Sequence, residues 1–350
     1  MKHRTARTVH TARTVRAAGL VLPALLAILA GGCGRQGDRR AGGMEVLAGG
    51  WQLVGFENEL DLSGIAAATA SQCLVGSDES FHVQPGVIDA AQRRIEAGQP
   101  IALPLEVVPG KPGKREVDIE GVVFAPERGS YYVVGSHGVG KKKGDLQPAR
   151  HSVFQVPVDP CTGLVDQSRI RRSSLSPWLE ATPAVAAHLH RPLQHNGLNI
   201  EGLAHAGGRL FFGLRAPNKR GRALVLELPA DELFGGQPRP LAVHQVKVGA
   251  GRGIRELAAV RGGFVVLTGN ASAEPSKKIP RSAAPGPDTR FELLLWNGRD
   301  PAATRLGVLP ATGGKAEGLL VLDDAAQHVD LLVLFDSLPG GAPVCVRCRR

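Results

Sequence analysis

The sequence lacks the short motifs that mark the common hydrolase and nucleotide-binding folds. It contains no Gly-x-Ser-x-Gly nucleophile elbow, no His-Glu-x-x-His zinc motif, no phosphate-binding loop and no dinucleotide fingerprint. The glycine-rich run at residues 249–253 lacks the strand–helix setting that such a fingerprint needs. Long amphipathic helices are also scarce, whereas short β-rich runs recur between turn signals, so the pattern indicates an all-β domain.

Cysteine and net charge are limited as well. Cys345 and Cys348 form a CxxC pair, but no second pair lies at metal-ligand spacing, which disfavours a zinc or redox role. In an oxidising compartment we expect Cys73, Cys161, Cys345 and Cys348 either to form structural disulfides or to be buried as free thiols. The formal net charge is +10, and the segment before Cys33 carries five of these positive charges without an acid. The rest of the chain therefore has a net charge of only about +5, which gives no argument for nucleic-acid binding.

The N-terminal region has the organisation of an export signal. Five basic residues precede an apolar run at 17–30, which is short for a membrane span and suits a signal-peptide core. The run closes in Leu29-Ala30-Gly31-Gly32-Cys33, which resembles the lipobox of bacterial lipoproteins and implies lipidation of Cys33. The alternative is a plain secretory signal with an incidental cysteine.

These features predict three regions. We expect a signal peptide at 1–32, a flexible Gly/Arg-rich tether at 33–44 and a folded domain at 45–350. The predicted location is the cell envelope, where the protein is anchored to the membrane through Cys33 and faces the periplasm or the outside.

One pattern occurs five times along the chain. Each copy has an acidic or serine-containing motif, a strand, a turn, a second apolar strand and a polar exit residue. Successive copies start 57, 81, 55 and 61 residues apart. The motif and second strand of the copies lie at 61–65 and 72–78, 118–122 and 131–137, 199–203 and 210–215, 254–258 and 264–270, and 315–319 and 331–337.

The repeat predicts a β-propeller with four-stranded antiparallel blades. We count five blades, or six if the insert or the C-terminus contributes another. The insert at 174–188 is expected to contain a short helix, and the strand at 51–56 is expected to complete the last blade and so close the ring. The competing fold is a pair of β-sandwiches, which the fivefold repetition disfavours.

The strand order places the chemistry at one mouth of the propeller. Because the second strand runs antiparallel to the first, its end lies on the same face as the motif. Ser63 and four glutamates are then expected to ring the central channel: Glu120, Glu201, Glu256 and Glu317. The exit residues expected around the same mouth are Asp78, His137, Arg215, Asn270 and Asp336.

Carboxylates gathered near an axis need a counter-charge or protons. One interpretation is a divalent cation such as calcium held by the four glutamates, and another is a pair of carboxylates for acid–base work. The alternative is structural: each glutamate accepts backbone N–H bonds from the neighbouring blade or pairs with an arginine such as Arg215 or Arg255.

Three basic loops open on the same predicted face, at 141–151, 219–222 and 277–281. They favour binding of an anionic group, although lysine runs are often only solvated. The predicted ligand-binding residues are Arg215, His137, Lys141, Arg150, His151 and Arg222.

The motifs in combination resemble a known bacterial family. The segments Asp118-Ile119-Glu120-Gly121, Asn199-Ile200-Glu201-Gly202-Leu203 and Glu317-Gly318-Leu319, with the exits Gly135-Ser136-His137 and Gly213-Leu214-Arg215, are similar to those of domain of unknown function 3616. The resemblance spans about residues 61–337 and implies a propeller-like fold without an established activity. The Glu-Gly motif is also similar to that of phytase-like esterase propellers, which implies phosphoester or ester hydrolysis.

Two functional hypotheses follow. The first is an envelope lipoprotein whose charged propeller mouth binds an anionic small molecule or an envelope protein. The second is a metal-assisted hydrolase of phosphoesters or other esters, in which the glutamates hold a divalent cation and Arg215 binds the anion.

Overall fold

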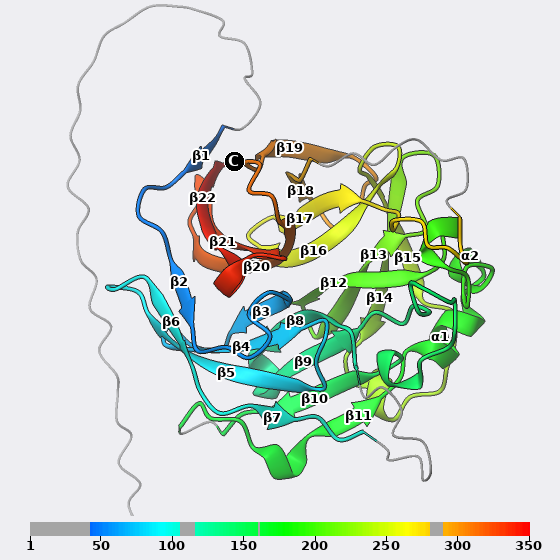
Figure 1. The fold of residues 1–350 in the computed structure, drawn as a ribbon, viewed down its shortest axis with the longest axis horizontal. Coiled ribbons are helices and arrows are strands. Elements are labelled where there is room, and N and C mark those ends of the chain that lie inside the picture. Colours follow the sequence, from blue (N-terminus) through cyan, green and yellow to red (C-terminus); the bar gives the residue numbers. More distant parts are fainter. Residues whose placement is uncertain (1–42, 106–115, 160–161, 281–289) are drawn as a thin grey trace, which may run out of the picture. The chain divides into compact units, whose positions relative to one another are not determined.

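A computed structural model describes residues 43–105, 116–159, 162–280 and 290–350. The predicted signal peptide, Cys33, Cys161 and Arg281 lie outside the described residues. Five sheets, antiparallel except for one strand pair, make up nearly all of the regular structure, and their innermost strands lie around the middle of the view in Figure 1.

Each sheet is one blade, and its strands run outward in nearly sequential order. The first blade holds β3 (Leu62–Ala67), β4 (Gln72–Ser77), β5 (His82–Asp89) and β6 (Arg94–Ala97), joined by β2 (Gln52–Val54) and β7 (Ile101–Ala102). The second holds β8 (Ile119–Ala125), β9 (Ser130–Gly135), β10 (Val153–Pro157) and β11 (Arg171–Ser173). The third holds β12 (Asn199–Ala206), β13 (Arg209–Ala216), β14 (Arg222–Pro229) and β15 (Ala242–Lys247). The fourth holds β16 (Arg252–Val260), β17 (Gly263–Asn270), β18 (Glu292–Trp296) and β19 (Ala303–Val308). The fifth holds β20 (Lys315–Asp324), β21 (His328–Asp336), β22 (Val344–Arg349) and β1 (Met44–Val46).

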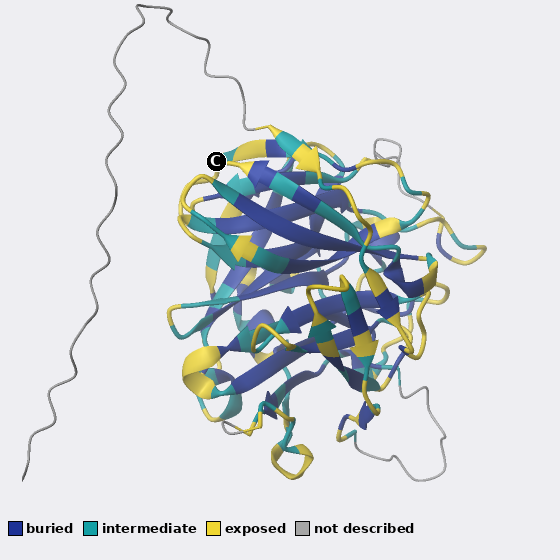
Figure 2. Cartoon of the chain, turned by 90° about the vertical axis from the view of Figure 1, so that its left-hand side faces the viewer, coloured by how far each residue is buried: buried dark blue, intermediate teal, exposed yellow. Residues whose placement is uncertain are grey.

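The innermost strands form a closed ring. β3 contacts β8, β8 contacts β12, β12 contacts β16, β16 contacts β20, and β20 returns to β3. Buried side chains follow these strands, whereas exposed residues gather in the turns and loops (Figure 2). The prediction of an all-β propeller with five four-stranded blades is confirmed.

The ring is closed by a different strand from the one predicted. β1, not the strand at 51–56, pairs antiparallel with β22 and becomes the outer strand of the last blade, with Val46 opposite Val346. β2 instead pairs in parallel with β6 of the first blade, where Leu53 is buried in the core. The prediction that N-terminal sequence completes the last blade therefore holds, but the choice of strand was wrong.

A β-bulge lies at the motif position of every inner strand. The register shifts across Ser63, Glu120, Glu201, Arg255 and Glu317, so that each of these residues is the extra one in its strand. A bulge bends the strand and re-aims the side chain that it carries. The same local deviation therefore re-aims the side chain at the equivalent position of all five inner strands.

The glycine after the bulge lets the blades approach closely. A Cβ atom on Gly121 would lie 2.7 Å from Cβ of Leu203, and one on Gly202 would lie 3.0 Å from the backbone nitrogen of Leu257. Both contacts are to the inner strand of the following blade. In the second and third blades the glycine of the repeated motif is thus required by packing between blades.

The predicted insert forms two short helices, α1 (Ser176–Ala181) and α2 (Pro183–Ala186). Leu175, Trp178, Leu179 and Val185 pack into the core shared by the second and third blades. The expected helix is confirmed. No helix in the described part of the chain has the length and hydrophobicity of a membrane span.

The described cysteines are free thiols. Cys73 and Cys348 are buried, and Cys345 is half-buried. For these three residues the buried-thiol alternative holds rather than the disulfide.

Removing β1 tests the ring closure. A chain that begins at Ala48 should have a free energy of unfolding about 2–4 kcal/mol lower than one that begins at Gly43, because it loses the pairing with β22 and the Leu47 N–H to Cys345 carbonyl bond. Urea denaturation of both chains measures the difference. Equal midpoints would show that β1 contributes nothing to closure.

Candidate functional site

A cavity of about 670 Å³ opens where the motifs and the second-strand exits meet. Its wall contains three of the four predicted glutamates, Glu120, Glu201 and Glu317. It also contains four of the five predicted exit residues: Asp78, Arg215, Asn270 and Asp336. The repeat therefore brings these seven residues together, although they span more than 250 positions of the chain.

The fourth unit departs from the predicted alignment by one residue. The bulged residue of β16 is Arg255, and Glu256 occupies the place that glycine has in all four other blades. Glu256 does not line the cavity. Its buried carboxylate accepts the backbone N–H groups of Leu203 and Leu257, both at 2.8 Å. The expectation that Glu256 faces the channel is therefore wrong.

Arg255 forms the centre of a buried chain of ion pairs. Its Nη1 lies 2.8 Å from Oε2 of Glu201, and its Nη2 pairs with Oε1 of Glu317. Arg215 extends the chain, because its Nη1 lies 2.8 Å from the other oxygen of Glu201. Alternating charges thus connect the third, fourth and fifth blades, and each arginine offsets the desolvation of a buried carboxylate.

Arg215 also ties two blades together through backbone groups. Its Nε donates to the carbonyl of Asn270 at 3.1 Å, and its Nη2 donates to the carbonyl of Ser272 at 2.7 Å. Three of its five N–H groups are therefore used within the protein. Its guanidinium is fixed at the cavity wall rather than free to follow a ligand.

Two cavity carboxyl groups, those of Glu120 and Asp78, have no ion-pair partner among the described residues. Glu120 is 4% exposed, and no hydrogen bond or ion pair joins its carboxyl group to another described residue. Burial raises its pKa well above the usual range, and Glu201 and Asp118 add to the effect. Burial likewise raises the pKa of Asp78 to about 8. Asp78 therefore favours the protonated form at neutral pH, and burial shifts Glu120 in the same direction.

Lys141 is the cation with the largest electrostatic effect on these two carboxyl groups. It reaches from an exposed loop into the cavity wall, and Asp118, followed by Glu120 and Asp78, raises its pKa despite the cost of desolvation. The cavity therefore has two unlike sides. One is a closed network of ion pairs, and the other combines a lysine with proton-holding acids.

A family model described as "Protein of unknown function (DUF3616)" matches residues 162–341, just over half of the chain. The chain belongs to the DUF3616 family. The match covers the third and fourth blades completely and the fifth blade up to the segment before β22, so it includes Glu201, Arg215, Arg255 and Glu317.

Several solved structures are similar to this DUF3616 protein, at low identity. A luciferin-regenerating enzyme shares 8% identity over 88% of this chain and 95% of that one, with a TM-score of 0.38. A GH43 β-1,3-galactosidase shares 9% over 87% and 59%, with a TM-score of 0.49. A periplasmic gluconolactonase of Pseudomonas aeruginosa shares 13% over 78% and 65%, with a TM-score of 0.36. The chain spans less than two thirds of the last two.

These likenesses carry no argument about function. No curated protein is detectably similar to the chain in sequence. The similarity to phytase-like esterase propellers that the Glu-Gly motif implied is not shown by these comparisons.

The remaining residues of the predicted ligand set lie away from the cavity wall. His137 is fully buried: its Nδ1 donates to the carbonyl of Gly135, its Nε2 accepts the N–H of Leu175 at 3.1 Å, and burial lowers its pKa to about 3. It is a neutral residue that fastens the helical insert to the second blade. Its place at a strand exit is as expected, but it does not line the cavity.

The other three have protein partners of their own. His151 lies 3.0 Å from Oγ of Ser176, and burial lowers its pKa to about 4. Arg150 pairs with Glu116 and, at 3.0 Å, with Asp118. Arg222 donates to Gln245 at 2.7 Å. Of the six residues in the predicted ligand set, Arg215 and Lys141 are the two in the cavity wall.

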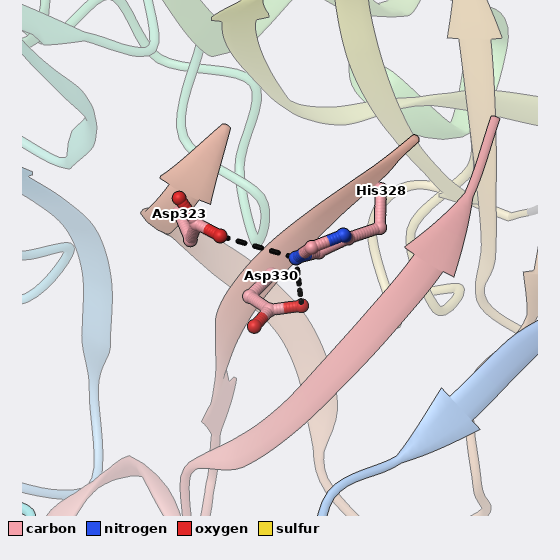
Figure 3. A group of neighbouring side chains, drawn as sticks. All are labelled: Asp323, His328 and Asp330. Carbon is pink, nitrogen blue, oxygen red and sulfur yellow. Dashed lines mark hydrogen bonds and ion pairs between the residues drawn. The ribbon is translucent and has the colours of Figure 1, made fainter. Parts of the chain in front are cut away.

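The four glutamates do not form a cage for one ion. Within the described ranges, only Asp323, His328 and Asp330 bring three metal-ligating atoms close together (Figure 3). This group lies at the turn of the β20–β21 hairpin, at the other end of β20 from Glu317. Nε2 of His328 is 3.1 Å from Asp323, and both oxygens of Asp330 are bonded to Arg347, at 2.7 and 2.6 Å. It is therefore better described as a surface ion-pair network than as a metal site.

Sequence reasoning missed Arg255 and Lys315 as cavity residues. The signal for Arg255 was available, because aligning Ile254 with Ile119 and Ile200 puts Arg255 at the glutamate position. An alignment on glutamate, by contrast, shifts the fourth unit by one residue. Lys315 is the first residue of the fifth motif copy, a position to which the repeat assigns no functional side chain.

Breaking the ion-pair chain tests its structural role. Arg255→Met should lower the free energy of unfolding by about 3–5 kcal/mol, because it leaves Glu317 buried without its partner. Arg239→Met is the matched control, since Arg239 pairs with Glu232 at the surface and should contribute less than about 1 kcal/mol. Thermal and urea unfolding measure both variants. If Arg255→Met and Arg239→Met lower the free energy of unfolding by the same amount, the assignment is contradicted.

Proposed function

We propose that the cavity binds a small anionic organic molecule, such as a hydroxy acid, a uronic acid or a sugar phosphate. The observation that carries the proposal is the pair of unpartnered carboxyl groups, Glu120 and Asp78, beside Lys141. A protonated carboxyl group donates a hydrogen bond, and an anion accepts it.

The charge balance of the cavity supports an anion. Six acidic and five basic side chains line it. When Asp78 and Glu120 hold their protons, four negative charges remain against five positive ones. The cavity then has a small positive excess in a partly desolvated space, where an anion is held more strongly than in water.

Different residues take different parts in this binding. Arg215 and Arg255 are fixed by the glutamates and give the wall its shape. Lys141 and Lys315 are compact charges on flexible stems that can move toward an anion, and Lys315 would leave its ion pair with Asp336 to do so. Glu120 and Asp78 supply the hydrogen-bond donors. Recognition therefore combines a rigid wall with adjustable cations.

The second hypothesis, metal-assisted hydrolysis, is less well supported by this arrangement. Both oxygens of Glu201 and one of Glu317 are engaged by arginine, which competes with a divalent cation for the same atoms. Turnover of p-nitrophenyl phosphate or ester substrates that is lost in Glu120→Gln would favour hydrolysis over binding alone.

A set of sugars that share a similar ring and differ in charge tests the binding proposal. Galacturonate and glucose 6-phosphate should bind, whereas neutral glucose and cationic glucosamine should bind at least about 10-fold more weakly, a difference of about 1.4 kcal/mol. Lys141→Ala should weaken binding of the two anions by about 10-fold or more. Isothermal titration calorimetry measures both. Equal affinity for all four sugars would refute anion binding.

The affinity for an anion should change with pH in one direction. The protonated forms of Asp78 and Glu120 favour the anion, and each deprotonation adds a negative charge to the cavity. Affinity for galacturonate, whose own charge is constant above pH 5, should therefore fall as pH rises through about 8, the raised pKa of Asp78. Asp78→Asn keeps a neutral side chain there and should flatten the decline. An affinity that rises over this range would contradict the proposal.

We also propose that the protein is an envelope lipoprotein anchored through Cys33, on the strength of the export-signal pattern. Cys33→Ser should abolish incorporation of labelled fatty acid and move the protein from the membrane fraction to the soluble fraction. Cys345→Ser is the matched control, because that residue lies in β22. Unchanged fractionation of the Cys33 variant would rule out the anchor.

A further inference from the structure

Four exposed lysines stand beside the cavity on two loops from different blades. They are Lys142 and Lys143, in the loop between β9 and β10, and Lys277 and Lys278, in the loop between β17 and β18. No carboxylate lies within ion-pair distance of any of them in the part of the chain that the structure describes. We call these four lysines the basic rim.

The two loops are fastened to each other although their lysines repel. Gln194, which is 2% exposed, donates from its Nε2 to the carbonyls of Lys141 and Glu274, at 3.1 and 2.9 Å. The hydroxyl of Ser276 donates to the carbonyl of Lys142 at 3.1 Å. The backbone of the two loops is therefore held together by a buried amide and a hydroxyl, despite the like charges that the loops carry.

The basic rim is continuous with the cavity. Lys141, which directly precedes Lys142, lines the cavity wall, and so do Ser272 and Glu274 of the other loop. A ligand that occupies the cavity and extends outward past Lys141 therefore meets the basic rim next.

The surroundings favour a flexible chain of charges over a protein surface or a membrane. Of the large apolar side chains that are exposed in the described residues, only Leu146 lies on these two loops. Stable protein interfaces and membrane insertion both bury apolar area, which this region does not offer. Lysines also bind as point charges and do not require the fixed geometry that arginine imposes.

We infer that the natural ligand is a linear polyanion, one charged end of which enters the cavity while the following units bind the basic rim. The inference rests on the proposed anion-binding cavity and names the class of ligand. The repeating charge is a carboxylate, as in a uronate chain, or a phosphate, as in a polyphosphate. Both sources share the chemistry that a row of lysines recognises.

Ligand length is the direct test. Affinities are measured by calorimetry for oligogalacturonides of one to six units and for polyphosphates of matched length. Affinity should rise roughly 10- to 100-fold with length, as several lysine contacts of modest strength accumulate. The gain should shrink at high salt. A steeper gain for one of the two series identifies the charged group.

Two fourfold variants show whether the gain in affinity with length comes from the basic rim or from the positive charge of the whole surface. Replacing Lys142, Lys143, Lys277 and Lys278 by Gln should abolish the gain with length. The matched control replaces Lys247, Arg299, Arg305 and Arg349 by Gln, which removes the same charge from exposed positions on the outer parts of three blades, and should keep the gain.

The outcomes distinguish this inference from the proposed function. If galacturonate binds through Lys141 but longer chains bind no better, the basic rim is overturned and the cavity stands. If only longer chains bind, and the four lysines are required, the basic rim stands and the cavity proposal fails. A preference for oligoglutamate or for anionic vesicles over both polyanion series would overturn the inference in favour of a protein or a membrane.

Discussion

Arg255 is the residue on which the arrangement of the site depends. It is buried between two carboxylates from the neighbouring blades, and it neutralises both at a point where the sheets converge. A propeller brings equivalent positions of all blades to one axis, so a repeated glutamate would repeat a buried negative charge. A single arginine in the same position of one blade resolves the repulsion for its two neighbours.

This solution serves only part of the ring. Glu201 and Glu317 flank Arg255, whereas Glu120 lies one blade further along and receives no arginine. Serine occupies the position in the first blade, where its hydroxyl donates to the carbonyl of Ile119. The ring is thus neutral and rigid on one side and proton-holding on the other, an asymmetry that a perfectly repeated sequence could not produce.

The sequence was sufficient for the architecture because the repeat has a physical origin. Five copies of one motif require five equivalent environments, and a propeller supplies them. Aligning the copies on glutamate, the chemically prominent residue, puts the fourth copy one residue out of register. Aligning the buried Ile254 with Ile119 and Ile200 puts it in register. The three-residue β1 carried no periodic signal, and the next candidate strand was chosen for the closure. The role of His137 depends on Leu175, 38 positions away in the insert, and no local pattern could reveal that contact.

The N-terminal segment links the two blades between which the ring closes. β1 belongs to the last blade and β2 to the first, with only residues 47–51 between them. A protein tethered through Cys33 would receive any mechanical load through this segment. The load would reach the short β1–β22 pair before any complete blade, while β2 would still hold the chain to the first sheet. The β1–β22 pair would therefore separate first under tension, while β20, β21 and β22 of the last blade and the other four sheets stay paired.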